Sequence, residues 1–314
     1  MITSGLFDHV LIDPAKELGA NKLFVVSGYA SPAMVQKHFS ELARLDLSVE
    51  ISLIIGMAPL DAINHINHQA FQNLMERTFP NRFYCSYINK LPRVHSKVYS
   101  WFKDDIPVAG FIGSSNYTQV AFLDENQLEV LDIADPIVCS QYYKGLVTNS
   151  LFCTHSDASI LVSQKDFHDS SSKTDFGYDK GVNLEKVSVS LLTQQGNMGS
   201  KSSLNWGQRG SRDRNEAYIP LCATIARSDF FPPIAQHFTV LTDDDKVLIM
   251  SKAQANGKAL HTPERNSILG EYFRHRLGLE GGSYVKRDNL ENYGRSDVTF
   301  YKIDDETYYM DFSV

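Results

Sequence analysis

Apolar strand-like runs alternate with amphipathic helical segments in the early part of the chain, and this alternation restricts the possible fold most strongly. Buried strands are predicted at residues 22–27, 49–57 and 82–88 from their apolar runs. Helices are predicted between them, at residues 32–44 and 62–78, where apolar residues recur at helical spacing. Strands joined through helices run parallel and carry those helices packed against the sheet. The sequence therefore predicts an α/β domain.

The pattern then changes to strands in close succession. Three strands are predicted at residues 96–103, 107–113 and 128–133. The first two are separated by Asp104 and Asp105, which are typical of a tight turn. We expect a helix at residues 136–151 to close the domain.

The second half of the chain has a different character, and 314 residues exceed one average domain. Residues 159–183 include a run of three serines, lack sustained periodicity and are interpreted as a linker. The residues that follow mostly show the period of two typical of strands, interrupted by one helix near 267–277. We expect an α/β domain over residues 1–158 and a small β-rich domain over residues 184–314.

The charge is negative overall but unevenly distributed. A formal net charge of −7 argues against a surface that binds nucleic acid everywhere. Residues 201–214, however, contain four basic side chains and one acidic side chain. An acidic protein with one local basic patch fits a protein that holds DNA at one place.

Several classes of site and location are disfavoured by the composition. The four cysteines are scattered, with no pair at metal-ligand spacing, which disfavours a zinc site. We expect neither a metal nor a cofactor. No apolar run approaches the roughly 20 residues that a membrane-spanning helix needs. The N-terminal residues lack the basic and apolar regions of a secretory signal. We expect a cytoplasmic protein.

The residues that could carry chemistry are gathered around one pair of predicted strands. His95 and Lys97 stand two residues apart on the first strand, so their side chains are expected on one face. The next strand runs into Gly-Ser-Ser-Asn, which would place Ser114 and Asn116 beside them. The predicted pocket combines an imidazole, an ammonium, an amide and a hydroxyl group.

Such a pocket suits the hydrolysis of a phosphodiester without a metal. The imidazole of His95 can attack phosphorus and form a covalent phosphohistidine. The ammonium, amide and hydroxyl groups can hold the non-bridging oxygens as negative charge builds up in the transition state. A carboxylate behind the histidine would fix its tautomer. Glu129 is the candidate for this carboxylate, and Glu125 is the alternative.

His95-x-Lys97 followed by Gly-Ser-x-Asn116 resembles the signature of the phospholipase D superfamily. The longer text at residues 26–32 and 113–119 looks like the NgoFVII-type restriction endonucleases, and the resemblance extends over nearly the whole chain. It implies that the histidine is the nucleophile and that the lysine and asparagine bind phosphate.

The same resemblance implies a fold and an activity. The fold is a phospholipase D-like α/β/α sandwich followed by a small β-rich DNA-binding pseudobarrel. The activity is that of a type II-like restriction endonuclease, which cuts double-stranded DNA at a specific sequence. One departure is Phe102, because the superfamily often has an aspartate at that position, five residues after the lysine.

The chain carries the histidine–lysine motif once. Hydrolysis through a phosphohistidine needs a nucleophile and a general acid for the leaving oxygen, and enzymes of this superfamily usually take two histidines from two motif copies. None of the other nine histidines is followed two positions later by lysine. We therefore expect a homodimer with the active site at its two-fold interface.

The second half contains residue types that read DNA bases. Arginine suits the major-groove acceptors of guanine, asparagine and glutamine suit adenine, and aspartate suits the amino group of cytosine. By resemblance, this half looks like the plant-type pseudobarrel, in which two arms reach into the major groove. Residues 205–215 would form the first arm and residues 261–267 the second. The predicted DNA-contacting residues are Trp206, Gln208, Arg209, Arg212, Asp213, Arg214 and Asn215 in the first arm, and Arg265 and Asn266 in the second.

Two other functions are compatible with the motif. A lipid phosphodiesterase of the same superfamily is disfavoured by the base-reading arm and by the lack of an amphipathic membrane helix. A catalytically silent DNA-binding regulator is disfavoured by the intact set of His95, Lys97 and Asn116. Some enzymes of this family act with a separate helicase-like ATPase. This chain has no glycine-rich loop ending in Gly-Lys-Ser/Thr, so any dependence on ATP would come from such a partner.

Overall fold

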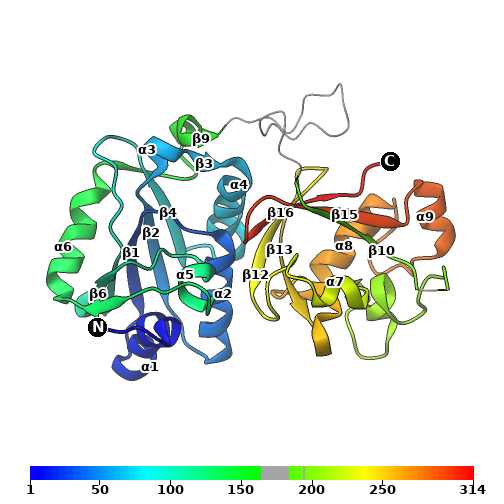
Figure 1. Cartoon of the computed structure of the whole chain (residues 1–314), viewed down its shortest axis with the longest axis horizontal. Coiled ribbons are helices and arrows are strands. Elements are labelled where there is room, and N and C mark those ends of the chain that lie inside the picture. Colours follow the sequence, from blue (N-terminus) through cyan, green and yellow to red (C-terminus); the bar gives the residue numbers. More distant parts are fainter. Residues whose placement is uncertain (164–183, 194) are drawn as a thin grey trace. The chain divides into compact units, whose positions relative to one another are not determined.

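The computed structural model of the chain describes residues 1–163, 184–193 and 195–314. The chain divides into two compact units, Met1–Val182 and Asn183–Val314, and each is described by itself (Figure 1).

A seven-stranded sheet forms the centre of the first unit, in the order β7-β6-β5-β1-β2-β4-β8. β1, β2 and β4 run parallel to one another, as the alternation of strands and helices predicts. The later strands pair antiparallel with their neighbours. The strands are β1 (Lys22–Ser27), β2 (Glu50–Ile55), β4 (Phe83–Ile88), β5 (Val98–Lys103), β6 (Ile106–Gly113), β7 (Leu131–Ile133) and β8 (Ser150–Phe152).

Helices cover both faces of this sheet, which makes the unit an α/β/α sandwich (Figure 1). The N-terminal helices, α2 and α4 contribute to the larger core, and α6 covers a smaller core that includes Val26, Ile54 and Val98. α2 begins after Ser31, whose Oγ accepts a hydrogen bond from the backbone N of Met34 at 3.1 Å. The helices are η1 (Phe7–Ile12), α1 (Asp13–Leu18), α2 (Pro32–Arg44), α3 (Ala58–Asp61), α4 (His65–Asn73), η2 (Leu74–Thr78), α5 (Gln119–Leu123), α6 (Pro136–Val147) and η3 (Ser156–Leu161).

Some elements differ from the predicted boundaries. The strands predicted to begin at residues 96 and 128 begin at Val98 and Leu131. The helix predicted over residues 136–151 ends at Val147, and the short strand β8 follows it and pairs with the end of β4. Because β8 has three residues and is defined by this pairing, the local pattern did not reveal it.

The predicted linker, residues 159–183, lies outside the described residues from position 164 onward. Its first residues belong to the first unit. They complete η3 and form β9 (Val162–Ser163), which pairs in parallel with β3 (Ile63–Asn64).

The second unit is built on a seven-stranded sheet in the order β10-β15-β16-β12-β13-β14-β11. The two edge strands, β10 and β11, approach each other, so the sheet curls into a nearly closed barrel. Its core contains the clustered rings of Phe231, Phe238, Phe300 and Tyr308. The strands are β10 (Lys186–Ser190), β11 (Ile219–Pro220), β12 (His237–Thr242), β13 (Val247–Ala253), β14 (Ala259–His261), β15 (Asp297–Lys302) and β16 (Thr307–Asp311). The helices are η4 (Ser203–Gln208), α7 (Ala223–Arg227), η5 (Ala255–Gly257), α8 (Asn266–Arg276) and α9 (Arg287–Tyr293).

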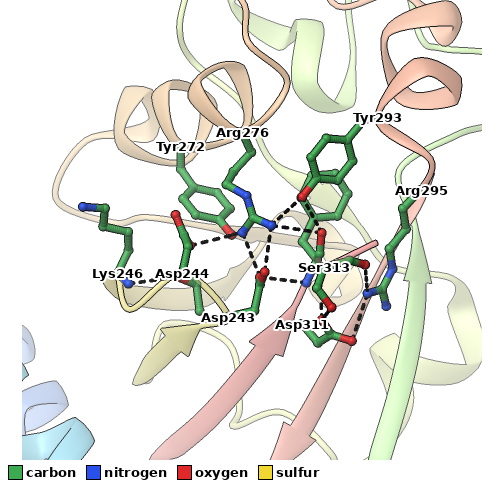
Figure 2. A network of polar contacts seen from close by, with 11 residues as sticks. Asp243, Asp244, Lys246, Tyr272, Arg276, Tyr293, Arg295, Asp311 and Ser313 are labelled. Atoms are coloured by element: carbon green, nitrogen blue, oxygen red, sulfur yellow. Dashed lines mark hydrogen bonds and ion pairs between the residues drawn. The ribbon is translucent and has the colours of Figure 1, made fainter. Parts of the chain in front are cut away.

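A polar network anchors the end of α8 to the C-terminal strand region (Figure 2). Arg276 donates two hydrogen bonds to the carboxylate of Asp243, at 2.8 and 2.7 Å, and one to the backbone O of Phe312 at 3.1 Å. Arg295 forms a separate ion pair with Asp311 at 2.9 Å. The contacts of Arg276 attach the last residue of α8 to the turn after β12 and to the C-terminal residues.

Candidate active site

The topology of the first sheet brings the predicted catalytic segments together at one end of the strands β1, β5, β6 and β7. Val26 at the end of β1 pairs with Val98 at the start of β5, and Val98 also pairs with Ile112 near the end of β6. Gly113 in turn pairs with Leu131 at the start of β7. The residues just beyond these positions therefore lie close together: 27–29, 94–97, 114–116 and 129–130.

His95 and Lys97 are adjacent, but not for the predicted reason. Residues 94–97 precede β5 and are not in a strand. The backbone N of Val94 instead bonds to the O of Gly56, just beyond β2, at 3.0 Å. Only glycine fits at position 56, because a Cβ atom there would lie 1.9 Å from the backbone O of Val94. Lys97 then folds back, with Nζ 2.8 Å from the backbone O of His95 and 3.1 Å from its Nδ1.

The two side chains have different environments. His95 is exposed, whereas Lys97 is buried. Burial lowers the pKa of Lys97, and the nearby carboxylate of Glu129 opposes that shift. The ammonium group is thus a fixed, partly desolvated charge next to the imidazole.

Asn116 is held in a defined orientation beside the histidine. Its Oδ1 accepts a hydrogen bond from the backbone N of Tyr29 at 3.1 Å and lies 3.4 Å from Oγ of Ser27. The Nδ2 group is therefore the end of the amide that can donate to a bound anion. A side chain at Gly28 would come within 3.1 Å of His95 Cδ2 and 3.4 Å of Asn116 Oδ1, so these two residues flank the glycine.

Ser114 and Glu129 form a pair of their own. Ser114 Oγ donates to the Glu129 carboxylate and accepts from the backbone N of Val130 at 3.0 Å. The other carboxylate oxygen of Glu129 accepts from Gln127. Among the contacts of the described residues, neither Glu129 nor the exposed Glu125 hydrogen-bonds to His95. The role of a carboxylate that orients the histidine stays a prediction.

Two residues that support the site, Ser27 and Tyr29, were not predicted from the sequence. Ser27 is buried, and its Oγ donates to the backbone O of Tyr29 and accepts from the backbone N of Tyr117 at 2.9 Å. The ring of Tyr29 stands edge-on to His95, with centroids 5.9 Å apart, and its hydroxyl group bonds to Asp61. Their position could have indicated a place in the site, because Ser27 ends the buried strand β1 and Tyr29 follows it at the same end of the sheet.

A buried histidine supports the segment from behind. Nε2 of His38 lies 2.8 Å from the backbone O of Leu11, and its Nδ1 lies 2.8 Å from the hydroxyl group of Tyr117. Burial lowers the pKa of His38 to about 4. The ring is therefore neutral near pH 7, with Nε2 donating to the carbonyl and Nδ1 accepting from the tyrosine. This bond fixes the residue that follows Asn116.

The residues of the predicted first arm fall into two groups. Arg209, Arg212, Asp213 and Arg214 are exposed, and Arg212 stacks over the ring of Trp206 at 3.9 Å. By contrast, Gln208 and Asn215 are half-buried, and their amide groups bond to the loop after α8. Gln208 donates to the backbone O of Gly282 at 3.0 Å, and Asn215 accepts from the N of Gly282 at 2.6 Å.

The predicted second arm is less extended. Arg265 is exposed immediately before α8, and Asn266 begins that helix. Oδ1 of Asn266 lies 2.7 Å from Nδ1 of His261, within a hydrogen-bonded pair. Arg265 is the better placed of the two to meet a ligand.

Comparisons with known proteins bear on both units. Residues 4–159 match the model of the NgoFVII restriction endonuclease N-terminal PLD domain, and residues 179–304 match that of the NgoFVII C-terminal B3-like DNA-binding domain. No curated protein matches the chain.

Solved structures similar to this chain include NucT from Helicobacter pylori, with 13% identity, a TM-score of 0.34 and coverage of 48% of this chain and 96% of that one. The phospholipase D family member Nuc from Salmonella typhimurium has 14% identity, a TM-score of 0.32 and coverage of 42% and 82%. Polyphosphate kinase from Porphyromonas gingivalis has 14% identity, a TM-score of 0.28 and coverage of 49% and 24%.

A phospholipase D-like nuclease domain followed by a DNA-binding domain defines a DNA endonuclease, an enzyme that hydrolyses phosphodiester bonds. The chain belongs to the NgoFVII restriction endonuclease family. The predicted fold class, a phospholipase D-like sandwich followed by a β-rich pseudobarrel, is confirmed. In the described part of the chain, no helix has the length and apolar character needed to cross a membrane.

Proposed function

We propose that this endonuclease is sequence-specific and cuts DNA without a metal, through a covalent phosphohistidine on His95. The observation that carries the proposal is the exposed imidazole of His95, which lies next to the ammonium of Lys97 and flanks Gly28 together with the amide of Asn116. These neighbours can hold the non-bridging oxygens of a phosphodiester while the imidazole attacks. They require no cation to neutralise the phosphate.

The reaction would proceed in two displacements. In the first, an imidazole nitrogen of His95 forms a bond to phosphorus as the bond to the leaving sugar oxygen breaks, and that oxygen takes a proton from a general acid. In the second, water attacks phosphorus as the P–N bond to His95 breaks, and the general acid that lost its proton in the first step takes the proton of the water. The positive charge of Lys97 and the Nδ2 donor of Asn116 stabilise the charge that develops in both steps.

Cleavage in excess EDTA tests the metal-free chemistry. We expect a plasmid to be cut as fast in EDTA as in buffer with Mg²⁺, because no step as written passes through a cation. Digestion of a sequenced plasmid and mapping of the ends would measure this and reveal the recognition site. A metal-dependent restriction enzyme in a parallel digest controls for the chelation. Loss of cutting in EDTA alone would refute the mechanism.

We further propose that the general acid is His95 of a second copy of this chain. A face suited to that partner surrounds the site and exposes apolar side chains. Tyr142 on α6 is 41% exposed, and its hydroxyl lies 2.8 Å from Oγ of Ser96, next to the proposed nucleophile. Val138, one turn earlier on α6, is 60% exposed, and Ile112 and Leu128, near Ser114 and Glu129, are 46% and 95% exposed. Apolar side chains exposed around a catalytic group are typical of a protein interface.

The second domain would supply the specificity. The exposed arginines at 209, 212 and 214 and the carboxylate of Asp213 are the side chains that we propose to meet base edges and phosphates. Double-stranded DNA is the proposed substrate. A separate helicase-like ATPase remains a proposed partner, and any use of ATP would belong to it. Cleavage by the isolated chain that depends on ATP would argue against this assignment.

A further inference from the structure

One buried arginine of the second unit has all its hydrogen-bonding capacity directed at the backbone. Arg274 on α8 is 1% exposed. Its Nε donates to the backbone O of Ser283 at 2.8 Å, and its two terminal nitrogens donate to four other carbonyl groups. These are the carbonyl groups of Gly270 at 3.1 Å, Asn215 at 3.4 Å, Leu204 at 3.0 Å and Arg214 at 3.1 Å. A guanidinium has five N–H groups, so every donor can be assigned an acceptor.

Three of these carbonyl groups belong to the two ends of the first arm. Leu204 comes immediately before residues 205–215, and Arg214 and Asn215 complete them. A single cation therefore joins the start of the arm to its end. The carbonyl group of Ser283 attaches both ends to the loop that follows α8, and that of Gly270 lies on α8 itself.

The buried amide of Asn205 strengthens the same attachment. Its Nδ2 donates to the backbone O of Val285 at 2.7 Å, and its Oδ1 accepts from the N of Val285 at 2.8 Å. Gln208 and Asn215 hold Gly282 in the same loop. The side chains of Asn205, Gln208 and Asn215 thus tie the arm to residues 282–285, while residues 209–214 stay exposed.

These hydrogen bonds would raise the affinity of the arm for DNA by holding it in one conformation. Residues 209–214 contain no regular helix or strand, and Ser211 has a φ of 72°. Ordering a flexible loop on contact with DNA would cost backbone conformational entropy at each ordered residue. An arm that is already ordered avoids this cost, so its DNA affinity is higher.

We propose that Arg274 is the positioning residue of DNA recognition, which holds the first arm in its binding conformation before DNA arrives. Its burial keeps it from touching DNA, so it acts through the arm. This inference rests on the proposed role of residues 205–215 as a DNA-contacting arm.

Arg276 provides a matched control. It lies two residues further along α8, and its guanidinium is also largely buried in a dense polar network (Figure 2). Its recorded partners include Asp243, Tyr293 and Phe312, and none of its partners lies in the arm. Lysine at either position removes a guanidinium from the same helix, so both variants are expected to lose stability.

The test compares Arg274→Lys with Arg276→Lys in the full chain, each combined with His95→Ala so that DNA is bound but not cut. The probe is a labelled plasmid fragment that the wild-type enzyme cuts, and a fragment that it leaves intact measures non-specific binding. We expect Arg274→Lys to lose roughly tenfold or more in affinity for the first fragment. Binding to the second fragment should hardly change, and amide hydrogen exchange at residues 205–215 should become faster. Arg276→Lys should leave affinity and arm exchange nearly unchanged.

Equal affinities of the two lysine variants, or unchanged exchange in the arm, would overturn the inference. Should Arg274→Lys fail to fold, Asn205→Ala takes its place with the same expectation, because Asn205 is also buried and bonds to the same loop. Arg209→Ala separates the two proposals. If it weakens binding while Arg274→Lys does not, the inference about Arg274 alone fails; if neither weakens binding, the arm does not read DNA and both fail.

Discussion

Replacement of His95 by alanine should abolish DNA cleavage and leave specific DNA binding intact. The expected loss is on the order of a thousandfold or more, as for other residues that act as covalent nucleophiles. The side chain is exposed, so its removal should change the free energy of unfolding by little. Cleavage is measured on a plasmid under single-turnover conditions, and binding by gel shift on a fragment with the site.

A second surface imidazole controls for the loss of a histidine as such. His9 is exposed on the N-terminal helix, where it bonds to Asp13, and is not among the residues gathered at the site. His9→Ala should cut at the wild-type rate. Retention of a tenth or more of the activity by His95→Ala would remove this residue from the nucleophile's role, and parallel loss of binding would point to misfolding instead.

A dimer with one wild-type subunit and one His95→Ala subunit should be almost inactive. In the proposed mechanism the two imidazoles serve one phosphodiester, so removing either takes away the nucleophile or the general acid. Mixed dimers can be isolated by placing a different affinity tag on each subunit and purifying over both resins. Their single-turnover rate is then compared with that of the two parent homodimers.

Two independent active sites, one in each subunit, would give the mixed dimer a different cleavage rate. If each subunit cut DNA with its own histidine, the mixed dimer would keep about half of the wild-type activity, and the shared-site proposal would be wrong. Mixed dimers of wild type and His9→Ala should be fully active, which controls for the tags and the purification. A chain that stays monomeric at the assay concentration would contradict the proposal directly.

The α/β order was predictable because periodicity is local. The pattern of a buried strand or of an amphipathic helix is visible within a few residues of sequence. The parallel pairing of β1, β2 and β4 then follows from the helices that connect them. Residues 94–97 could not be predicted in this way. Their path depends on the close approach of Val94 to Gly56, some forty positions earlier in the chain. His95 and Lys97 meet because the lysine folds back, a contact that strand periodicity does not describe.

The second domain shows the same limit for polar residues. The amide side chains of Gln208 and Asn215 are chemically suited to bases, yet each bonds to Gly282, which is far away in the sequence. Arg274 would be expected in solvent on a charged helix, but carbonyl groups from separate segments surround it. A side chain's chemistry can be read from its type, whereas its partner depends on the tertiary fold.

Isolation of the covalent intermediate tests the central claim most directly. The wild-type enzyme is mixed with a DNA fragment that it cuts, quenched during turnover in alkaline denaturant to preserve an acid-labile N–P bond, and digested for mass spectrometry. The account predicts a phosphate-linked nucleotide on the peptide that contains His95, and none in the His95→Ala enzyme. Turnover without any adduct, or an adduct on a different residue, would contradict it.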